Sequence, residues 1–555
     1  MPHPTVVLPV RKPGRSSSSA MYRVLITDGV DREGVELLSG DPDLQVDEVP
    51  TLAPEELLAR IGEYDALIGR SATRISEELL RQGARLKVVG RAGVGVDNIA
   101  LDAATALGIA VINAPAGNTI AVAELFFGSV IALLRHIPWA DSSMHAGRWD
   151  RSRLLGSELR GRTLGIVGVG RIGSEVATRA EAFGMTVVGY DPYVADERFQ
   201  TLRVRRADSL EGLLAAADIL TVHTPLTEET RGLIGRRELS KLPPGAVVAN
   251  LARGGIVDEA ALGTALVNGE LRGAVVDVYT VEPLPADHPL RAARNALLTP
   301  HIGASTAEAQ RNVAVDVCEA VRTALVRGEL SQSINAAEVN GVRWEELQRA
   351  FRLTRQMAAV ARALLADRGV RVIRRLALHC GAELVGGSGA LLSAAAIGVL
   401  YDVIETDRLN LINARTLADA RGIELAASES PQLESPCAVE ITVGGGMQAI
   451  TIAGVAPPAA PPRLTQIGSF RVDVAPRQTL IILTNHDVPG VIGRVGTMLG
   501  GAGVNIAEYH QARLLQGGDA LAAISVDDAV SAELGRALLE LPDVLSATVV
   551  CFRDT

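Results

Sequence analysis

The sequence predicts an α/β protein, with two doubly wound parallel-sheet domains followed by two α+β domains. The chain has 555 residues, which at about 100–200 residues per domain predicts several domains. Strand and helix patterns alternate through residues 21–328 in two series, as in parallel sheets covered on both faces. Residues 478–555 read strand, helix, strand, strand, helix, strand, the βαββαβ order of a ferredoxin-like unit.

Residues 1–20 are predicted to be a disordered N-terminal extension. They are basic, carry the serine run Ser16–Ser19 and contain no acid. They also lack the continuous apolar stretch of a secretory signal. Met21 is a second possible start, and the regular pattern begins there.

The first series opens with a buried strand at 22–26 and a helix at 33–38. Short strands are predicted at 65–69 and 86–90, separated by helical stretches. A long apolar helix at 120–134 then leads into the second series. Five strand candidates of that series fit a dinucleotide-binding sheet, which ends near Leu298: 163–168, 186–190, 219–223, 246–250 and 273–277.

The C-terminal part begins after a helix at 305–327 and Gly328. Residues 329–477 are rich in long Ala/Leu helices and contain the cluster Pro457–Pro462, which indicates a separate domain. In the last unit, the strands are expected at 479–484, 504–513, 520–526 and 544–552, and the helices at 490–500 and 529–541.

Composition excludes several classes of protein. Apolar residues make up 48% of the chain and charged residues 21%, so wholesale disorder is ruled out. The net charge of −10 argues against a nucleic-acid-coating protein. The apolar run 384–401 carries glycines near its start, and we interpret it as buried core rather than a membrane span. The four cysteines lack the close spacing that binds zinc, so we expect no metal and a reduced cytoplasm.

A glycine motif follows the first strand of the second series. Gly168 permits a tight turn, Gly170 lets the backbone approach a pyrophosphate, and Gly173 lets helix and strand pack closely. Asp191 ends the next strand, where its carboxylate would accept hydrogen bonds from ribose hydroxyls and repel a 2′-phosphate. The motif therefore predicts a bound NAD rather than NADP.

Three polar residues, Arg253, Glu282 and His301, follow strands of the second series. Such sheets bind ligands at the carboxyl ends of their strands. Oxidation of a 2-hydroxy acid needs a base for the hydroxyl proton and a cation for the carboxylate. His301 suits the base and Arg253 the cation, and Glu282 would stabilise the imidazolium.

Together with the glycine motif, these residues resemble the D-isomer-specific 2-hydroxyacid dehydrogenase family over about residues 22–327. The resemblance implies that Arg253, Glu282 and His301 are the catalytic residues and that the NAD domain is inserted into a substrate-binding domain. The implied boundaries are a substrate-binding domain at 21–118 and 302–328, an NAD-binding Rossmann domain at 119–301, an intervening domain at 329–477 and an ACT domain at 478–555.

The segments 69–74, 89–98 and 114–119 are most similar to the family members that oxidise 3-phosphoglycerate to 3-phosphooxypyruvate for serine synthesis. The resemblance implies that Arg70 and Arg74 face the substrate phosphate. Backbone N–H groups of Val94 and Gly95 would hold the carboxylate together with Arg253. The cofactor contacts that the resemblance implies are Val94, Gly168, Gly170, Arg171, Ile172, Gly173, Asp191, Thr224, Leu251, Ala252, Arg253, Asp277, His301, Ile302, Gly303 and Ala304.

Residues 479–555 resemble an ACT domain, a module that binds amino acids at paired interfaces. The resemblance implies that Asn485, Asp487 and Asn505 bind L-serine as a feedback effector. A dimerisation module without effector is the alternative. Residues 330–475 resemble the intervening domain of long-form members, most clearly at Asn410–Arg415, and no site is assigned there.

The apolar helix 120–134 predicts a homodimer, and paired ACT domains would extend it to a homotetramer. Other readings remain open. The same catalytic residues suit a reductase of 2-oxoglutarate or of hydroxypyruvate and glyoxylate. A member of another class, an NAD-sensing scaffold without catalysis, would share the architecture.

Overall fold

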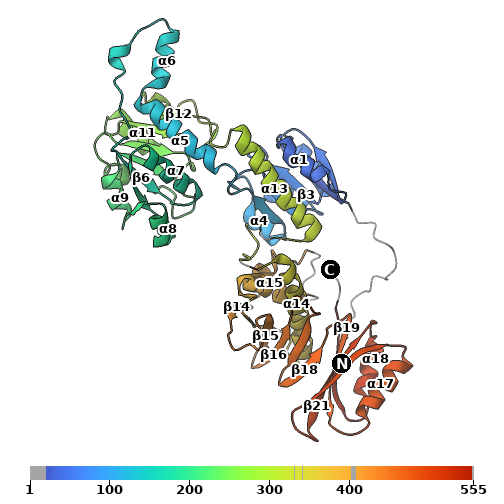
Figure 1. The fold of residues 1–555 in the computed structure, drawn as a ribbon. Helices are drawn as coiled ribbons and strands as arrows, with labels where there is room; N and C mark the ends of the chain where they lie inside the picture. Colours follow the sequence, from blue (N-terminus) through green and yellow to red (C-terminus); the bar gives the residue numbers. More distant parts are fainter. Residues whose placement is uncertain (1–20, 331, 341, 402–407, 553–555) are drawn as a thin grey trace.

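The computed structural model describes residues 21–330, 332–340, 342–401 and 408–552. The predicted extension at 1–20 lies outside them. The described residues form four sheets in chain order, each with its own helices (Figure 1). The first two are parallel α/β sheets and the last two contain antiparallel strands, so the predicted fold class is confirmed.

The first sheet is parallel and has the order β2-β1-β3-β4-β5. One face packs against the long helix α13, through Val313, Val317 and Val321, and the other face forms a second core. Its elements are β1 (Tyr22–Ile26), α1 (Arg32–Ser39), β2 (Leu44–Glu48), α2 (Pro54–Arg60), β3 (Ala66–Gly69), α3 (Glu77–Gln82), β4 (Val88–Arg91), α4 (Leu101–Ala106), β5 (Ala110–Asn113) and α13 (Ala307–Arg327).

The second sheet is also parallel, with the order β12-β11-β10-β9-β6-β7-β8, the arrangement of dinucleotide-binding folds. Its strands are β6 (Thr163–Val167), β7 (Thr186–Tyr190), β8 (Arg205–Arg206), β9 (Ile219–Val222), β10 (Val247–Asn250), β11 (Gly273–Val276) and β12 (Ala296–Leu298). Its helices are α7 (Arg171–Ala182), α8 (Asp196–Thr201), α9 (Leu210–Ala216), α10 (Arg236–Leu239), α11 (Glu259–Val267) and α12 (Pro289–Ala292).

The sheet therefore has seven strands, two more than the five that the sequence pattern predicts. The two additional strands are the edges, β8 and β12. β8 has two residues, both exposed, and no residue of β12 is fully buried. A buried-strand pattern cannot identify elements that bury so little.

Helix α5 (Thr119–Leu134) leads from the first sheet to the second, and α6 (Ile137–His145) projects beyond it (Figure 1). The single chain buries nine residues of α5, so its apolar composition does not require a partner. Exposed apolar side chains lie at Ile120 of α5 and in the projecting segment 137–155, at Ile137, Met144, Trp149 and Leu155. No single described helix is long and apolar enough to cross a membrane, although α5 and α6, bent by 63°, pass that test as a pair.

The third sheet has the order β14-β13-β15-β16-β17-β18 and is antiparallel except between β13 and β14. The expected long helices are α14 (Trp344–Asp367) and α15 (Ser388–Leu400), followed by α16 (Ala414–Asp419). Its strands are β13 (Arg375–Cys380), β14 (Glu424–Glu429), β15 (Ala438–Gly445), β16 (Gln448–Val455), β17 (Arg463–Ile467) and β18 (Phe470–Val474).

The fourth sheet is antiparallel with the order β20-β21-β19-β22, and its chain order is the predicted βαββαβ. Its elements are β19 (Thr479–His486), α17 (Val491–Gly501), β20 (Ile506–Arg513), β21 (Asp519–Val526), α18 (Ala532–Leu539) and β22 (Val544–Cys551). One face is covered by α17 and α18. The other contributes Leu480, Ile482, Ala523 and Val550 to the core of the third sheet and α14.

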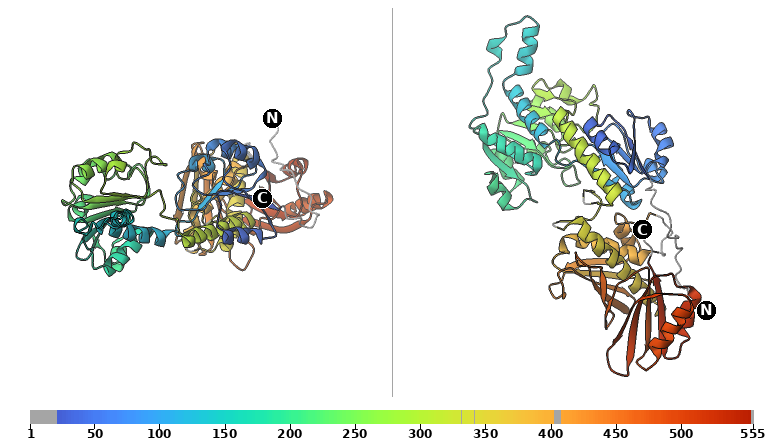
Figure 2. Two further views of the ribbon diagram at one scale, coloured as in Figure 1. Left: turned by 90° about the horizontal axis from the view of Figure 1, so that it is seen from above. Right: turned by 45° about the vertical axis from the view of Figure 1, so that its right-hand side comes forward.

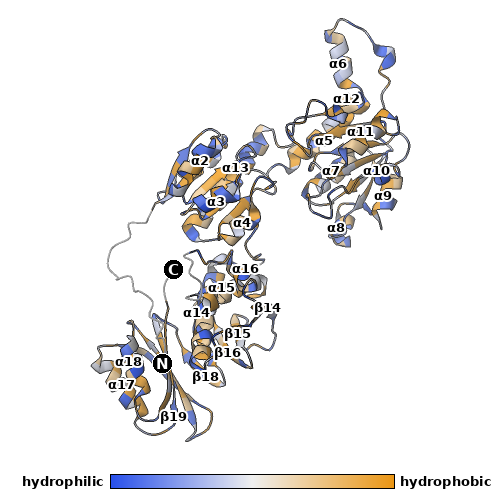
Figure 3. Ribbon diagram, turned by 180° about the vertical axis from the view of Figure 1, so that it is seen from behind, coloured by the Kyte–Doolittle hydropathy of each residue, from blue (hydrophilic) through white to orange (hydrophobic). Residues whose placement is uncertain are grey.

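The two parallel sheets form separate lobes joined through α5 and the segment before α13, as the two views in Figure 2 show. In Figure 3 the strands are mainly coloured as hydrophobic, whereas the hydrophilic residues lie mostly on surrounding helices and loops. The carboxyl ends of the parallel strands in both lobes carry the residues predicted to bind ligands.

Candidate active site

The glycine motif lies between β6 and α7 and has the geometry of a phosphate-binding turn. Gly168 has φ +91°, and a Cβ there would lie 2.7 Å from the carbonyl oxygen of His223. A Cβ on Gly173 would lie 2.1 Å from the oxygen of Gly168, so close packing requires glycine. Gly170 faces open space, and helix α7 begins after it at Arg171 and Ile172 without a side-chain cap. The first N–H groups of α7 are thus available to an anion.

Asp191 follows β7 beside this turn. Its Oδ2 accepts a hydrogen bond from the Val169 N–H at 2.9 Å, and its Oδ1 accepts one from the Tyr193 N–H at 3.0 Å. The hydroxyl oxygen of Thr224, next to Gly168, is buried without a partner among the described residues. A turn open at Gly170, a carboxylate and an unsatisfied hydroxyl fit a bound dinucleotide.

The remaining predicted cofactor residues surround the ends of β10 and β11. Leu251 and Ala252 are buried after β10. Asp277, 1% exposed, follows β11 and holds the loop after β12. Its carboxylate accepts hydrogen bonds from Thr299 Oγ1 and from the N–H groups of Ile302 and Gly303, at 2.6–2.9 Å. Asp277 therefore fixes the backbone from His301 to Ala304.

His301 and Glu282 form a hydrogen-bonded pair. His301 Nδ1 lies 2.7 Å from Glu282 Oε2, and the other carboxylate oxygen of Glu282 accepts the Tyr279 N–H at 2.9 Å. Because an ionised carboxylate only accepts, Nδ1 carries the proton and Nε2 is left as the basic nitrogen. His301 has φ +53°, and its N–H donates to the Asp277 carbonyl at 2.9 Å. The loop thus presents a histidine that can accept a substrate proton.

The turn that carries Glu282 is itself anchored. Glu259, buried at the start of α11, accepts hydrogen bonds from Thr280 N and Oγ1 at 2.6 and 2.7 Å. Its second oxygen lies 3.0 Å from His288 Nε2. A Cβ on Gly254, next to Arg253, would lie 2.0 Å from the Tyr279 backbone. This packing brings the Arg253 and Glu282 segments together.

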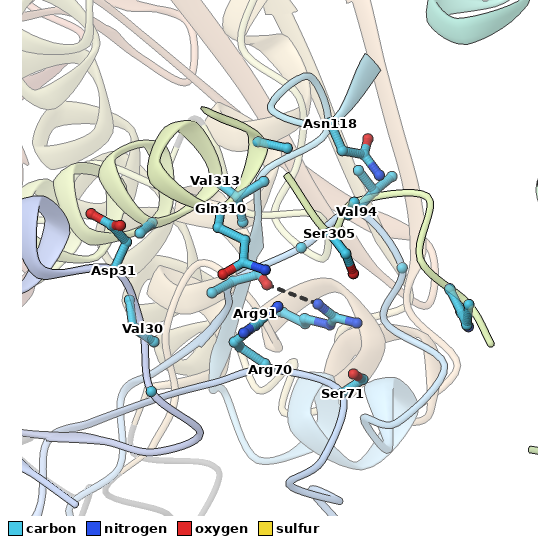
Figure 4. A pocket seen from close by; sticks show the side chains of 18 of the residues that line it. Val30, Asp31, Arg70, Ser71, Arg91, Val94, Asn118, Ser305, Gln310 and Val313 are labelled. Atoms are coloured by element: carbon cyan, nitrogen blue, oxygen red, sulfur yellow. Dashed lines mark hydrogen bonds between the residues drawn. The ribbon is translucent and has the colours of Figure 1, made fainter. Parts of the chain in front are cut away.

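A cavity of about 130 Å³ lies between the two lobes at His301. The residues that line it include Arg70, Arg91, Val94, Gly95, Arg253, His301, Ala304, Ser305 and Gln310. Figure 4 shows Arg70, Arg91, Ser71, Ser305 and Gln310 around it. Arg253 crosses from the second lobe, with Nε 3.0 Å from Asp97 Oδ2, and a Cβ on Gly95 would lie 2.2 Å from its guanidinium. The three arginines give the cavity the character of an anion site.

Arg91 is a site residue that sequence reasoning missed. Burial, followed by the repulsion of Arg253 and Arg70, lowers the pKa of Arg91 to about 10. Its Nη1 donates to the Ala92 carbonyl at 2.9 Å, and its Nε is buried without a partner among the described residues. Arg91 is the last residue of β4, so the strand-end rule that identified Arg253 also applies to it.

Arg74 is not brought to this cavity. Its side chain is exposed, and Arg74 is not among the lining residues, whereas Arg70 is. The neighbouring Thr73 is buried and donates its hydroxyl proton to Asp28 Oδ1 at 2.7 Å. The chain after Thr73 then turns into β-bridge contact with Ile99, which carries Arg74 away from the lining residues.

His223, between β9 and Thr224, is buried near the cofactor turn. Burial lowers the pKa of His223 to about 4, so the ring is neutral at neutral pH. Its Nε2 lies 3.0 Å from Thr221 Oγ1, and its ring meets Phe126 edge-on. These contacts fit a structural role for His223 in the wall of the cofactor site.

The three residues expected to bind serine are not together in one chain. Asn485, at the end of β19, pairs in register with Ala520, whereas Asn505 precedes Ile506, which pairs with Val526. Six residues of β21 separate the two positions, about 20 Å. Each side chain has partners: Asn485 accepts from Gln511, Asp487 pairs with Arg513 at 3.2 Å, and Asn505 donates to Asp527 at 2.8 Å.

Known proteins with similar sequences include members of one enzyme family. Residues 127–303 match the NAD-binding domain model of the D-isomer-specific 2-hydroxyacid dehydrogenases. A D-3-phosphoglycerate dehydrogenase of Methanocaldococcus jannaschii is 36% identical over 531 residues, which cover 96% of this chain and 100% of that protein. One of Bacillus subtilis is also 36% identical, over 96% of this chain and 99% of its own length. The chain belongs to the D-3-phosphoglycerate dehydrogenase family.

The solved structures agree for the catalytic lobes. The crystal structure of a Thermus thermophilus protein is 38% identical and superposes with a TM-score of 0.52, covering 56% of this chain and 99% of its own. As a D-3-phosphoglycerate dehydrogenase family member, the chain is an NAD-dependent oxidoreductase with the glycine motif in its NAD-binding domain. Arg253, Glu282 and His301 lie where that domain meets the first lobe.

Proposed function

We propose that this chain oxidises 3-phospho-D-glycerate at C2 to 3-phosphooxypyruvate, the first step of phosphorylated serine synthesis. The observation that carries the proposal is the cavity itself, where Arg70, Arg91 and Arg253 converge beside His301. A phosphate and a carboxylate on one small substrate call for this many cations.

Each residue that lines the cavity has a role set by its position. His301 Nε2 accepts the hydroxyl proton, and Glu282 stabilises the imidazolium that results. Arg253 holds the carboxylate and the C2 oxygen, with the N–H groups of Val94 and Gly95 on the same carboxylate. Arg70 and Arg91 face the phosphate. NAD, when bound, would supply the acceptor for the hydride that leaves C2.

The residues fit NAD through the turn at Gly168–Gly173, Asp191 and Thr224, with Leu251 and Ala252 beside the nicotinamide. Asp277 is placed near the nicotinamide carboxamide in this proposal, and its carboxylate also accepts the three hydrogen bonds that hold the His301 loop in place.

The test is a kcat/KM panel with 3-phosphoglycerate, 2-hydroxyglutarate, glycerate and their oxidised forms. A phosphate site predicts a strong preference for 3-phosphoglycerate over glycerate. Equal efficiency with the two would remove the case for a phosphate site, and a preference for 2-oxoglutarate would favour the reductase alternative. NADH binding without turnover of any 2-oxo acid would indicate the scaffold.

Assembly and control form a second part of the proposal. The exposed apolar residues of 137–155 suit a dimer contact at the NAD lobe. Asn485 and Asn505 lie at opposite ends of the fourth sheet, so a serine site that uses both needs two copies. A homotetramer with L-serine between paired ACT domains satisfies both conditions. The four unpaired cysteines suit the cytoplasm.

A further inference from the structure

The turn that carries Arg70 is held from two sides by side chains. On one side, Asp28 Oδ2 accepts the N–H groups of Arg70 and Thr73 at 2.8 and 3.0 Å. On the other, Asn98 Nδ2 donates to the carbonyl oxygens of the same two residues at 3.0 and 2.7 Å. The turn therefore has little freedom of its own, and its position follows those of Asp28 and Asn98.

Asn98 belongs to the loop that carries Val94 and Gly95. Its carbonyl also accepts the Ile75 N–H at 2.8 Å, so side chain and backbone both join this loop to the Arg70 turn. A different residue anchors the other end of the loop: Asn113, at the end of β5, donates to the Val94 carbonyl at 2.5 Å. The loop thus has one anchor beside its carboxylate-binding N–H groups and another toward Arg70.

We propose that Asn98 is a positioning residue that sets the distance between the carboxylate-binding and phosphate-binding ends of the cavity, and so determines selectivity for a three-carbon phosphorylated acid. The inference rests on the proposed function, because it takes Arg70 as a phosphate ligand. Asn98 does not line the cavity, so it acts through Arg70.

The substrate has a limited distance between its two anionic groups. The carboxylate of 3-phosphoglycerate is on C1 and the phosphate on C3, so both ends bind well only at one separation of their sites. With the carboxylate fixed at Val94 and Gly95, C2 stays near His301 whether or not Arg70 is placed correctly. A displaced Arg70 turn therefore weakens phosphate binding and leaves the reacting carbon in position.

The experiment compares Asn98→Ala with the unsubstituted full-length enzyme on 3-phosphoglycerate and D-glycerate. Losing two positioning hydrogen bonds should raise KM for 3-phosphoglycerate by about 10- to 100-fold. We expect kcat with 3-phosphoglycerate and both constants with glycerate to stay within about twofold. The matched control is Asn113→Ala, which loosens the carboxylate end and should lower kcat/KM for both substrates by the same factor.

Two further variants keep the test decisive if Asn98→Ala is poorly folded. Asp28→Asn loosens the same turn from the other side and should produce the same selective rise in KM. In an Arg70→Ala background, Asn98→Ala should add no further loss with 3-phosphoglycerate, because its effect passes through Arg70.

Each outcome separates the two hypotheses. If the unsubstituted enzyme does not prefer 3-phosphoglycerate to glycerate, the phosphate site itself is wrong. If it does, but Asn98→Ala and Asp28→Asn lower kcat/KM for both substrates equally, Asn98 has a general structural role and the inference is overturned. An additive loss in the Arg70→Ala background would overturn it as well.

Discussion

The catalytic lobes bring their candidate ligand residues together, whereas the fourth sheet holds its candidate ligand residues far apart. Arg70, Arg91, Arg253 and His301 come from separate segments of the first 301 residues, yet line one cavity of a single chain. Asn485 and Asn505 are only 20 residues apart, and the antiparallel register places them at opposite ends of a sheet.

The difference follows from where each residue lies along its strand. In a parallel sheet every strand ends at the same edge, so residues that follow strands gather there regardless of their sequence separation. Strands β19 and β20 both run antiparallel to β21 and therefore in one direction, but Asn485 lies at the end of β19 and Asn505 just before the start of β20. The cavity is therefore lined by residues of one chain, whereas an effector site using both asparagines requires a second one.

The largest expected effect is on the catalytic side. His301→Ala should lower kcat by about 10²- to 10⁴-fold, because the proton acceptor is lost. NADH binding, followed by fluorescence titration, should survive, since the glycine turn and Asp191 are untouched. Glu282→Gln is the partner variant and should cost less, because His301 keeps a hydrogen-bonded neighbour. An unchanged kcat in His301→Ala would refute the assignment.

Arg91→Met should separate activity from stability. We expect kcat/KM for 3-phosphoglycerate to fall by about 10- to 100-fold, through loss of a charge-assisted contact to the phosphate. The Tm should rise, because the substitution removes a partly buried cation whose pKa is already lowered to about 10. Calorimetry without ligand checks the second expectation. A fall in Tm would mean that Arg91 has a stabilising partner in the free enzyme.

The effector side is tested by truncation. The shortened chain should end near Ala337 rather than Arg327, because Asn335 donates to Ile109 and accepts from Val111 at the edge of the first sheet. We expect the full chain to be a tetramer that loses about tenfold in activity with L-serine, and the shortened chain to be an active, insensitive dimer. Light scattering beside activity assays checks both. An insensitive full chain would leave the C-terminal sheets as assembly modules.

The smallest effect concerns pH and stability. The pKa of His223 is lowered to about 4 in the folded state, and an unfolded histidine titrates near 6.5. Between these values the unfolded chain binds more protons, so the free energy of unfolding falls as pH falls, by about 1 kcal/mol between pH 6.5 and 5.5. His223→Gln should remove this slope in denaturant titrations. His486→Gln, at a half-exposed position of the fourth sheet, is the control and should retain it.

The sequence predicts site residues well where the geometry is regular, as at the strand ends of a parallel sheet. Strand ends in a parallel sheet converge, and this rule located Arg253, Glu282 and His301 from the sequence alone. It applies equally to Arg91, which was overlooked because it lies within a longer glycine-rich motif. Buried strands such as β6, β7 and β10 were found, whereas β8, with two exposed residues, carries no signal.

Other features depend on contacts that no periodic pattern encodes. Arg74 is four residues from Arg70, but the bonds of Thr73 to Asp28 and of the following segment to Asn98 decide where each side chain lies. Nine residues of the apolar helix α5 are buried within the chain and Ile120 is exposed, so apolar composition alone does not identify which residues face a partner. The register of the fourth sheet places Asn485 and Asn505 at opposite ends of the sheet, and the sequence motif does not show this separation.

The packing of the fourth sheet limits where the chain can be divided or fused. Leu480, Ile482, Ala523 and Val550 are shared with the core of the third sheet and α14. A recombination breakpoint near residue 478 would therefore expose an apolar face on both products. A breakpoint just after Asn335 would expose fewer buried apolar residues than one near residue 478. We therefore expect chains that keep the two C-terminal modules together to be more soluble than chains that separate them near residue 478.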